Sequence, residues 1–282
     1  MKWRGRRGSK NIEDGRRVGG SRAGAGGIGG VGAIIVLLLG WYFGFDTSAL
    51  LSDPGRQNTG TAEMSPAEQD AAQFVSVTLA DTEEVWTAIF RDQLGATYQP
   101  PVLYLFTGST GSPCGDASGA TGPFYCPGDR KAYLDTAFFA TLEQRLGAKG
   151  DFAAAYVVAH EIGHAVQDQR GILSRTNQIR AGASEEKRNA ISVRVELQAD
   201  CYAGIWAREA EQTFGTLDPG DVQEAINAAK KIGDDTLQAN AGQRPMPHTF
   251  THGTSQQRAR WFAVGYKTGL IDACDTFSAR DL

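Results

Sequence analysis

One short run of residues constrains this chain more than any other feature: His160-Glu161-Ile162-Gly163-His164, inside the apolar stretch 152–166. If the stretch is helical, residues four apart lie one turn above each other, so both imidazoles project from one face. Two neutral imidazoles at that spacing can bind one Zn²⁺, and Glu161 beside them can accept a proton from water. The alternative is a buried helix that carries two histidines by chance. Because the chain has only 4 histidines in 282 residues, and Glu fills the required position, the run predicts one zinc ion per chain.

A zinc ion used in hydrolysis needs a third protein ligand and an open position. Glu196 and Asp200 are four residues apart, so on a helix over about residues 184–212 they share one face. We expect Glu196 to be the third ligand and Asp200 to accept the outer N–H of a ligating histidine. Taken alone, such a pair is an ordinary solvated acidic face. The competing ligand, a third histidine six residues after His164, is absent because Arg170 occupies that position.

The other two histidines lie together in the segment 247–253. A zinc hydrolase gains most from a donor aimed at the oxyanion of the tetrahedral intermediate. We expect His252 to be this donor, with Arg258 either beside it or supporting the fold, and His248 to belong to the loop scaffold. The alternative is a surface loop with two idle histidines. Thr254 or Ser255 would cap a final helix over residues 256–268.

These motifs resemble those of the bacterial neutral zinc metallopeptidase family (YpfJ-like). The resemblance extends over nearly the whole chain, from residues 1–7 through 111–114, 122–127, the two motifs above and 233–235 to 250–258. More distantly, the chain is similar to membrane-bound gluzincins of the heat-shock and prenyl-protein-processing type. Those have His-Pro where this chain has His252-Gly253. The resemblance implies a gluzincin-type zincin fold and peptidase chemistry, and it supplies no substrate.

The remaining pattern predicts one α+β domain over residues 65–282. Ser65, Pro66 and Glu68 are typical of a helix start, and we expect helices over 66–79, 82–94 and 136–146. Alternating or apolar runs predict strands over 102–107, 124–127 and 131–135. We therefore expect a short mixed sheet packed on the active-site helix, with an edge strand that could hold a peptide by β-addition.

Charge is unevenly distributed along the chain. Residues 1–22 contain eight Lys or Arg and two acidic residues, a net charge of +6, whereas the other 260 residues have 20 basic and 30 acidic residues. The 23 residues from 23 to 45 carry no charge and are long enough to cross a bilayer. A basic segment before an apolar run indicates membrane orientation rather than nucleic-acid binding.

We therefore predict four segments: a basic cytoplasmic tail (1–22), a transmembrane signal anchor (23–45), a flexible linker (46–64) and the catalytic domain. Positive residues before the span would place that domain on the periplasmic or extracellular side of the cytoplasmic membrane. A cleaved signal peptide is the alternative. Its basic region would be unusually long, and no clear cleavage site follows the apolar run.

Four cysteines suit an oxidising compartment. Cys114 and Cys126 bracket a stretch rich in Gly, Ser and Pro that cannot hold itself by packing, so we predict a disulfide between them. Cys201 and Cys274 form a second disulfide, or Cys201 is a buried thiol beside the site. A zinc site made of four cysteines is not expected because no Cys-x-x-Cys is present.

Together these features predict a membrane-anchored zinc metallopeptidase that acts on a peptide or protein, with Glu161 as general base. Two alternatives stay open: a zinc hydrolase of a non-peptide amide in the cell envelope, and a catalytically idle, zinc-stabilised interaction module. Zinc ligation does not need Glu161, so its presence argues against the idle module.

Overall fold

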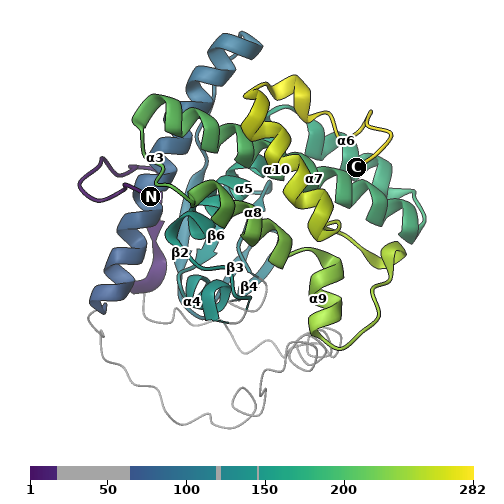
Figure 1. Ribbon diagram of the computed structural model, residues 1–282, viewed down its shortest axis with the longest axis horizontal. Coiled ribbons are helices and arrows are strands. Elements are labelled where there is room, and N and C mark those ends of the chain that lie inside the picture. The colour runs from purple at the N-terminus through teal and green to yellow at the C-terminus, as the bar shows by residue number, and fades with distance from the viewer. Residues whose placement is uncertain (18–63, 119–121, 145) are drawn as a thin grey trace.

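The computed structural model describes residues 1–17, 64–118, 122–144 and 146–282 (Figure 1). Its strands are β1 (Ile12–Asp14), β2 (Val102–Phe106), β3 (Ser109–Ser112), β4 (Gly115–Ser118), β5 (Phe124–Cys126) and β6 (Lys131–Asp135). Its longer helices are α3 (Pro66–Leu94), α4 (Ala137–Gln144), α5 (Asp151–Gln169), α6 (Ile172–Ala181), α7 (Glu185–Phe214), α8 (Asp221–Lys231), α9 (Asp234–Asn240) and α10 (Ser255–Thr268). Short 3₁₀ turns are η1 (Gly15–Arg17), η2 (Pro247–Thr249) and η3 (Ile271–Cys274).

The predicted α+β class and mixed sheet are confirmed. The four-stranded sheet has the order β1-β2-β6-β5, in which β5 is antiparallel to β6 and the other pairs are parallel. It lies beside α5, and the Tyr125 hydroxyl on β5 donates to Asp168 on that helix at 2.9 Å. Strands β3 and β4 form a separate hairpin, which the Cys114–Cys126 disulfide ties to β5.

Helix α3 is longer than predicted. The sequence indicated two helices, over residues 66–79 and 82–94, whereas the structure has one continuous helix. Asp81 and Thr82 lie at the predicted break, and such side chains often compete with the helix backbone for hydrogen bonds. Here the Asp81 carboxylate accepts from the Arg6 guanidinium, and the Thr82 hydroxyl donates to the Leu79 carbonyl at 2.7 Å. Both side chains have partners that leave the helical backbone bonds intact, so one helix of 29 residues forms.

Small residues bring α5, α7 and α10 close together. A Cβ atom on Gly163 of α5 would lie 3.1 Å from the Ala199 carbonyl oxygen on α7. Where α7 meets α10, a Cβ atom on Gly204 would lie 2.0 Å from the Phe262 carbonyl oxygen. A Cβ atom on Gly265 would lie 1.8 Å from the Cys201 carbonyl oxygen. Because no side chain separates the helices at these points, α5, α7 and α10 lie close together (Figure 1).

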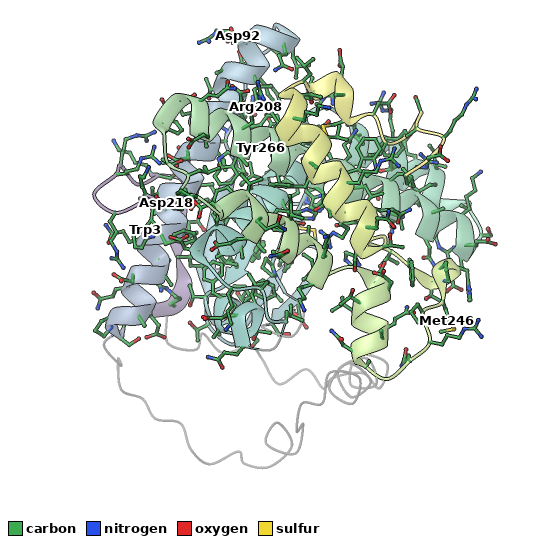
Figure 2. The ribbon with its side chains drawn as sticks, viewed as in Figure 1. Trp3, Asp92, Arg208, Asp218, Met246 and Tyr266 are labelled. Atoms are coloured by element: carbon green, nitrogen blue, oxygen red, sulfur yellow. A yellow bond between two sulfur atoms is a disulfide. The ribbon has the colours of Figure 1, made fainter. Side chains whose placement is uncertain are left out.

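The N-terminal segment, which we define as residues 1–17, corrects the prediction of a separate basic tail. Met1 and Trp3 are buried in the main hydrophobic core, where the Trp3 ring packs edge-on against Phe74 of α3 at 5.5 Å. Strand β1 adds to the sheet by parallel pairing with β2. Figure 2 shows Trp3 and Asp218 on the same side of the molecule, where Lys2 Nζ lies 3.7 Å from Asp218. The folded unit therefore includes residues 1–17 as well as the described residues from 64 onward.

The basic residues of this segment are bound by carboxylates of α3. Ion pairs join Arg4 to Asp70, Arg6 to Asp81 and Arg7 to Glu84. A single membrane crossing at residues 23–45 would separate these partners by a bilayer. That crossing and this packing therefore cannot occur together in one molecule.

None of the helices in the described ranges combines the length and the apolar composition needed to cross a membrane. The predicted span 23–45 and most of the predicted linker 46–64 lie outside the described residues.

Removing the Arg6 guanidinium should destabilise the fold. Asp81 is only 3% exposed, and burial raises the pKa of its carboxyl to about 6 although Arg6 opposes that rise. Loss of one partner from such a buried pair leaves an uncompensated charge, so Arg6→Ala should lower the free energy of unfolding by about 2–3 kcal/mol. Arg7→Ala is the matched control, because the Arg7–Glu84 pair is exposed and should contribute little. Urea unfolding measures the stability of both variants. Equal stabilities of the two variants would contradict a structural role for Arg6.

Candidate active site

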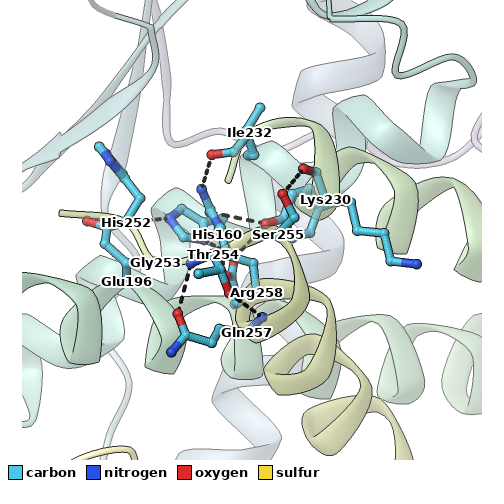
Figure 3. Close-up of polar contacts among 12 residues, drawn as sticks. His160, Glu196, Lys230, Ile232, His252, Gly253, Thr254, Ser255, Gln257 and Arg258 are labelled. Carbon is cyan, nitrogen blue, oxygen red and sulfur yellow. Dashed lines mark hydrogen bonds and ion pairs between the residues drawn. The ribbon is translucent and has the colours of Figure 1, made fainter. Parts of the chain in front are cut away.

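The structure brings all of the predicted site residues together. Helix α5 carries the histidines and Glu161, α7 carries Glu196 and Asp200, and α10 carries Arg258. The loop before α10 carries His252, which Figure 3 shows near Glu196 and His160. His248 lies apart on the turn η2, where its side chain is exposed and its carbonyl accepts from Asn189 at 3.0 Å.

Three side chains form a set that fits a zinc ion. Nε2 of His160 lies 3.1 Å from Glu196 Oε2, and Nε2 of His164 lies 3.6 Å from the same oxygen. All three donor atoms are within 4.8 Å of one another. Tetrahedral zinc with bonds of about 2.0–2.1 Å separates its ligand atoms by about 3.3 Å. The set therefore has the right atoms at the right spacing, with two nitrogens and one oxygen.

Asp200 joins the three helices beneath this set. Its carboxylate accepts from His160 Nδ1 at 2.9 Å, from Arg258 Nε at 2.8 Å and from the Tyr156 hydroxyl. Nη1 of Arg258 also donates to the Ile232 carbonyl at 3.2 Å (Figure 3). Because Nδ1 of His160 donates to Asp200, Nε2, which faces Glu196, is the nitrogen that can bind a metal once it gives up its proton.

Charges around the set shift its pKa values in a consistent way. Burial raises the pKa of Asp200, but the Arg258 guanidinium and the His160 imidazole together outweigh burial and hold that pKa below its usual value. Burial would lower the pKa of His160, yet the Asp200 and Glu196 carboxylates raise it to about 10. Burial raises the pKa of Glu196 as well, and the neighbouring imidazoles overcome this and lower it well below normal. These shifts favour ionised Asp200 and Glu196 carboxylates that face a protonated His160 imidazole.

Glu161 differs from the other carboxylates. Its side chain is 9% exposed, and within the described ranges no hydrogen-bond or ion-pair partner reaches its carboxylate. Burial raises the pKa of Glu161, although His164 and His160 oppose the rise. Glu161 is therefore a desolvated base beside the metal-ligand set and free to take a proton.

The loop that carries His252 is held by Asp234, a contact that sequence reasoning missed. Oδ2 of Asp234 accepts the backbone N–H groups of Thr251, His252 and Gly253 at 2.7–3.0 Å. Its Oδ1 lies 3.2 Å from His252 Nδ1. The next residue, Asp235, accepts from the backbone nitrogen and hydroxyl of Ser255, both at 2.7 Å. The motif 233–235 therefore fixes the loop, and a pair of acids after Gly233 was the available signal.

Sequence reasoning also missed Gln167, which lies one helical turn after His164. The two side chains meet at 2.8 Å, between His164 Nδ1 and Gln167 Oε1. Gln167 is fully buried. Its spacing of three residues from a ligand, on the same helix face, was the signal that could have identified it.

A second cluster of acidic residues does not belong to this site. Asp151, Asp221 and Glu224 bring their oxygens together on α5 and α8. The Met1 nitrogen lies 2.9 Å from Asp151 and 3.1 Å from Asp221, so an ammonium group fills the cluster. A cavity of about 580 Å³, lined by residues of α3 and α7 such as Glu83 and Glu209, also contains none of the candidate site residues.

Metal content tests the ligand set directly. Purified protein should contain about one zinc per chain, which Glu196→Ala should deplete and Glu161→Gln should retain. Since protons compete with the metal for His160, whose pKa is about 10, zinc affinity should fall as the pH falls. Elemental analysis and a zinc-binding titration across pH measure these effects. Full zinc retention by Glu196→Ala would place the third ligand elsewhere.

Comparison with known proteins identifies the family of the chain. Residues 1–277 match the family model described as "Putative neutral zinc metallopeptidase". The protein named "Uncharacterized protein YpfJ" of Escherichia coli K12 is 45% identical over 285 residues, which cover 98% of this chain and 99% of that protein. An uncharacterized protein of Mycobacterium tuberculosis H37Rv is 44% identical over 223 residues, covering 76% of this chain and 74% of that protein. No solved structure matches the chain. The chain therefore belongs to the neutral zinc metallopeptidase family that its motifs predicted.

Proposed function

We propose that this protein is a zinc-dependent metallopeptidase that hydrolyses peptide bonds. One observation carries the proposal: Glu161, a buried carboxylate without a partner in the described ranges, lies beside a ligand set of two imidazoles and one carboxylate. A zinc site that served only stability would not need this additional base. A desolvated carboxylate next to a hydrolytic metal is instead what general base catalysis requires.

Each residue has a defined part in this proposal. His160, His164 and Glu196 would hold the zinc ion, which when bound lowers the pKa of water and polarises a carbonyl group. Glu161 takes the proton of the attacking water and delivers it to the leaving amine. His252, whose Nδ1 faces Asp234, directs Nε2 as a donor toward the oxyanion. Asp200 and Arg258 orient His160 and do not touch the substrate.

A peptide substrate has a place to bind beside this site. Strand β5 lies at the end of the sheet order, so its outer edge has no strand partner among the described residues. Its Tyr125 contacts α5, which places that edge next to the helix carrying the ligands. An extended peptide could add to this edge through main-chain hydrogen bonds. This feature favours a peptide over the alternative, a non-peptide amide of the cell envelope.

Membrane attachment through residues 23–45 and an envelope location remain proposals. The packing of residues 1–17 on α3 supports a revised form, in which both flanks of that segment lie on the same side of any membrane. A cysteine introduced at Lys10 and one introduced at Asp281, both exposed positions, should then react alike with a membrane-impermeant thiol reagent on intact cells. Opposite results would mean a single crossing, and would exclude the packed N-terminal segment in the cell.

Loss of the general base should abolish catalysis without loss of metal. Wild-type protein should cleave casein or a peptide library in a reaction that a chelator stops, and Glu161→Gln should be inactive at unchanged zinc content. Cleavage by Glu161→Gln at the wild-type rate would overturn the assignment of the base. Failure of the zinc-loaded wild type to cleave any peptide would favour the non-peptide amide or the idle module.

The oxyanion donor should affect turnover more than binding. A hydrogen bond that strengthens as charge develops appears mainly in kcat, so His252→Ala should lower kcat by about 10²–10³ with KM little changed. His248→Ala is the matched control, since the His248 imidazole is exposed on the turn η2 and should have little effect. If His252→Ala removes zinc instead, His252 is a ligand and the Glu196 assignment is wrong.

A further inference from the structure

A buried network of amide side chains lies behind His164. Nε2 of Gln167 donates to the Val195 carbonyl at 2.8 Å and to Oε1 of Gln198 at 3.1 Å. Nε2 of Gln198 in turn donates to the Cys274 carbonyl at 2.9 Å. Gln167 is fully buried and Gln198 is 4% exposed. We call Gln167, Gln198 and the Cys274 carbonyl the glutamine network.

The hydrogen bonds of the network can run in only one donor-to-acceptor direction. A backbone carbonyl can only accept, so the amide nitrogens must face Val195 and Cys274. Gln167 Oε1 is then left facing His164 Nδ1, which must carry the hydrogen. With Nδ1 bound to Gln167, Nε2 of His164 is the nitrogen that can bind a metal once it gives up its proton, and this is the atom that faces Glu196. Two backbone carbonyls thus determine which nitrogen of His164 can bind a metal.

The far end of the network is covalently fixed. Cys274, on the turn η3, forms a disulfide with Cys201 of α7, and both cysteines are fully buried. The segment after Cys274 is also bonded to α7, since the Thr276 hydroxyl donates to the Arg194 carbonyl at 2.6 Å. The Cys274 carbonyl therefore has a fixed position relative to Gln198.

We propose that Gln167 is a positioning residue for His164 as a metal ligand, and that the network ending at the Cys201–Cys274 disulfide holds Gln167 in place. The two histidines then have different supports. His160 donates to a charged carboxylate that Arg258 neutralises, whereas His164 donates to a neutral amide. This inference rests on the zinc site of the proposed function and not on peptide cleavage.

Zinc affinity and the spectrum of bound cobalt test the inference. Gln167→Met should weaken zinc binding about 10–100-fold, the usual effect of losing a partner of a ligating histidine. It should also shift the visible absorption of the Co²⁺-loaded protein, because the imidazole is no longer fixed. Gln169→Met is the matched control on the same helix, since Gln169 contacts Gln99 outside the network and should bind zinc like wild type. Wild-type affinity and an unchanged spectrum in Gln167→Met would overturn the inference.

A double-mutant cycle separates positioning from general stability. Cys201→Ala with Cys274→Ala should weaken zinc binding, but should add little in the Gln167→Met background, because both changes act through one contact. Additive losses would overturn the role of the disulfide. Removing the other disulfide, with Cys114→Ala and Cys126→Ala, should leave zinc affinity unchanged.

A second variant covers the case in which loss of the disulfide prevents folding. Gln198→Met breaks the network with both disulfides intact, and should weaken zinc binding in the same direction as Gln167→Met. Wild-type affinity in Gln198→Met would contradict the network. Zinc binding by the wild type without peptide cleavage would remove the peptidase proposal alone, whereas absence of zinc binding would remove both.

Discussion

The buried pair of Asp200 and Arg258 is the interaction on which the rest of the site depends. Both side chains are almost fully excluded from water, and removing two charges from water is costly unless every polar atom has a partner. Here the carboxylate also accepts from His160 and Tyr156, so α5, α7 and α10 are joined through one group. Close approach at Gly204 and Gly265 makes this contact possible, because any side chain there would separate α7 from α10. Fold and ligand orientation therefore have a common physical cause.

Patterns among neighbouring residues predicted the helices and strands better than they predicted the contacts between them. The spacing within His160–His164 and the caps at Ser65, Thr254 and Gly269 depend on neighbouring residues, so the sequence was sufficient to place them. The motif 233–235 and the spacing of Gln167 from His164 could mark these residues as candidates, but the sequence alone does not show which groups Asp234 and Gln167 contact. The predicted break in α3 failed for the same reason, since the partner of Asp81 is Arg6, and lies 75 residues away.

The N-terminal segment shows how one charge pattern can have two physical meanings. Positive residues before an apolar run predict membrane orientation when the cations remain in solvent or face lipid headgroups. In this structure Arg4, Arg6 and Arg7 instead face carboxylates of α3, and Trp3 is buried against the same helix. A count of charges along the sequence cannot distinguish these cases, because it does not include the acidic partners that folding supplies.

Charge balance explains why a neutral amide suits His164. Three carboxylates, Glu161, Glu196 and Asp200, lie at the site with the Arg258 guanidinium, and a zinc dication with this guanidinium would balance them. Without metal, the imidazoles of His160 and His164 take the place of the dication, because nearby carboxylates raise the pKa of each above its usual value. Metal binding therefore exchanges bound protons for zinc while the buried charge stays nearly constant. A carboxylate at residue 167 would add an unbalanced negative charge to this interior, whereas Gln167 orients the imidazole and leaves the balance unchanged.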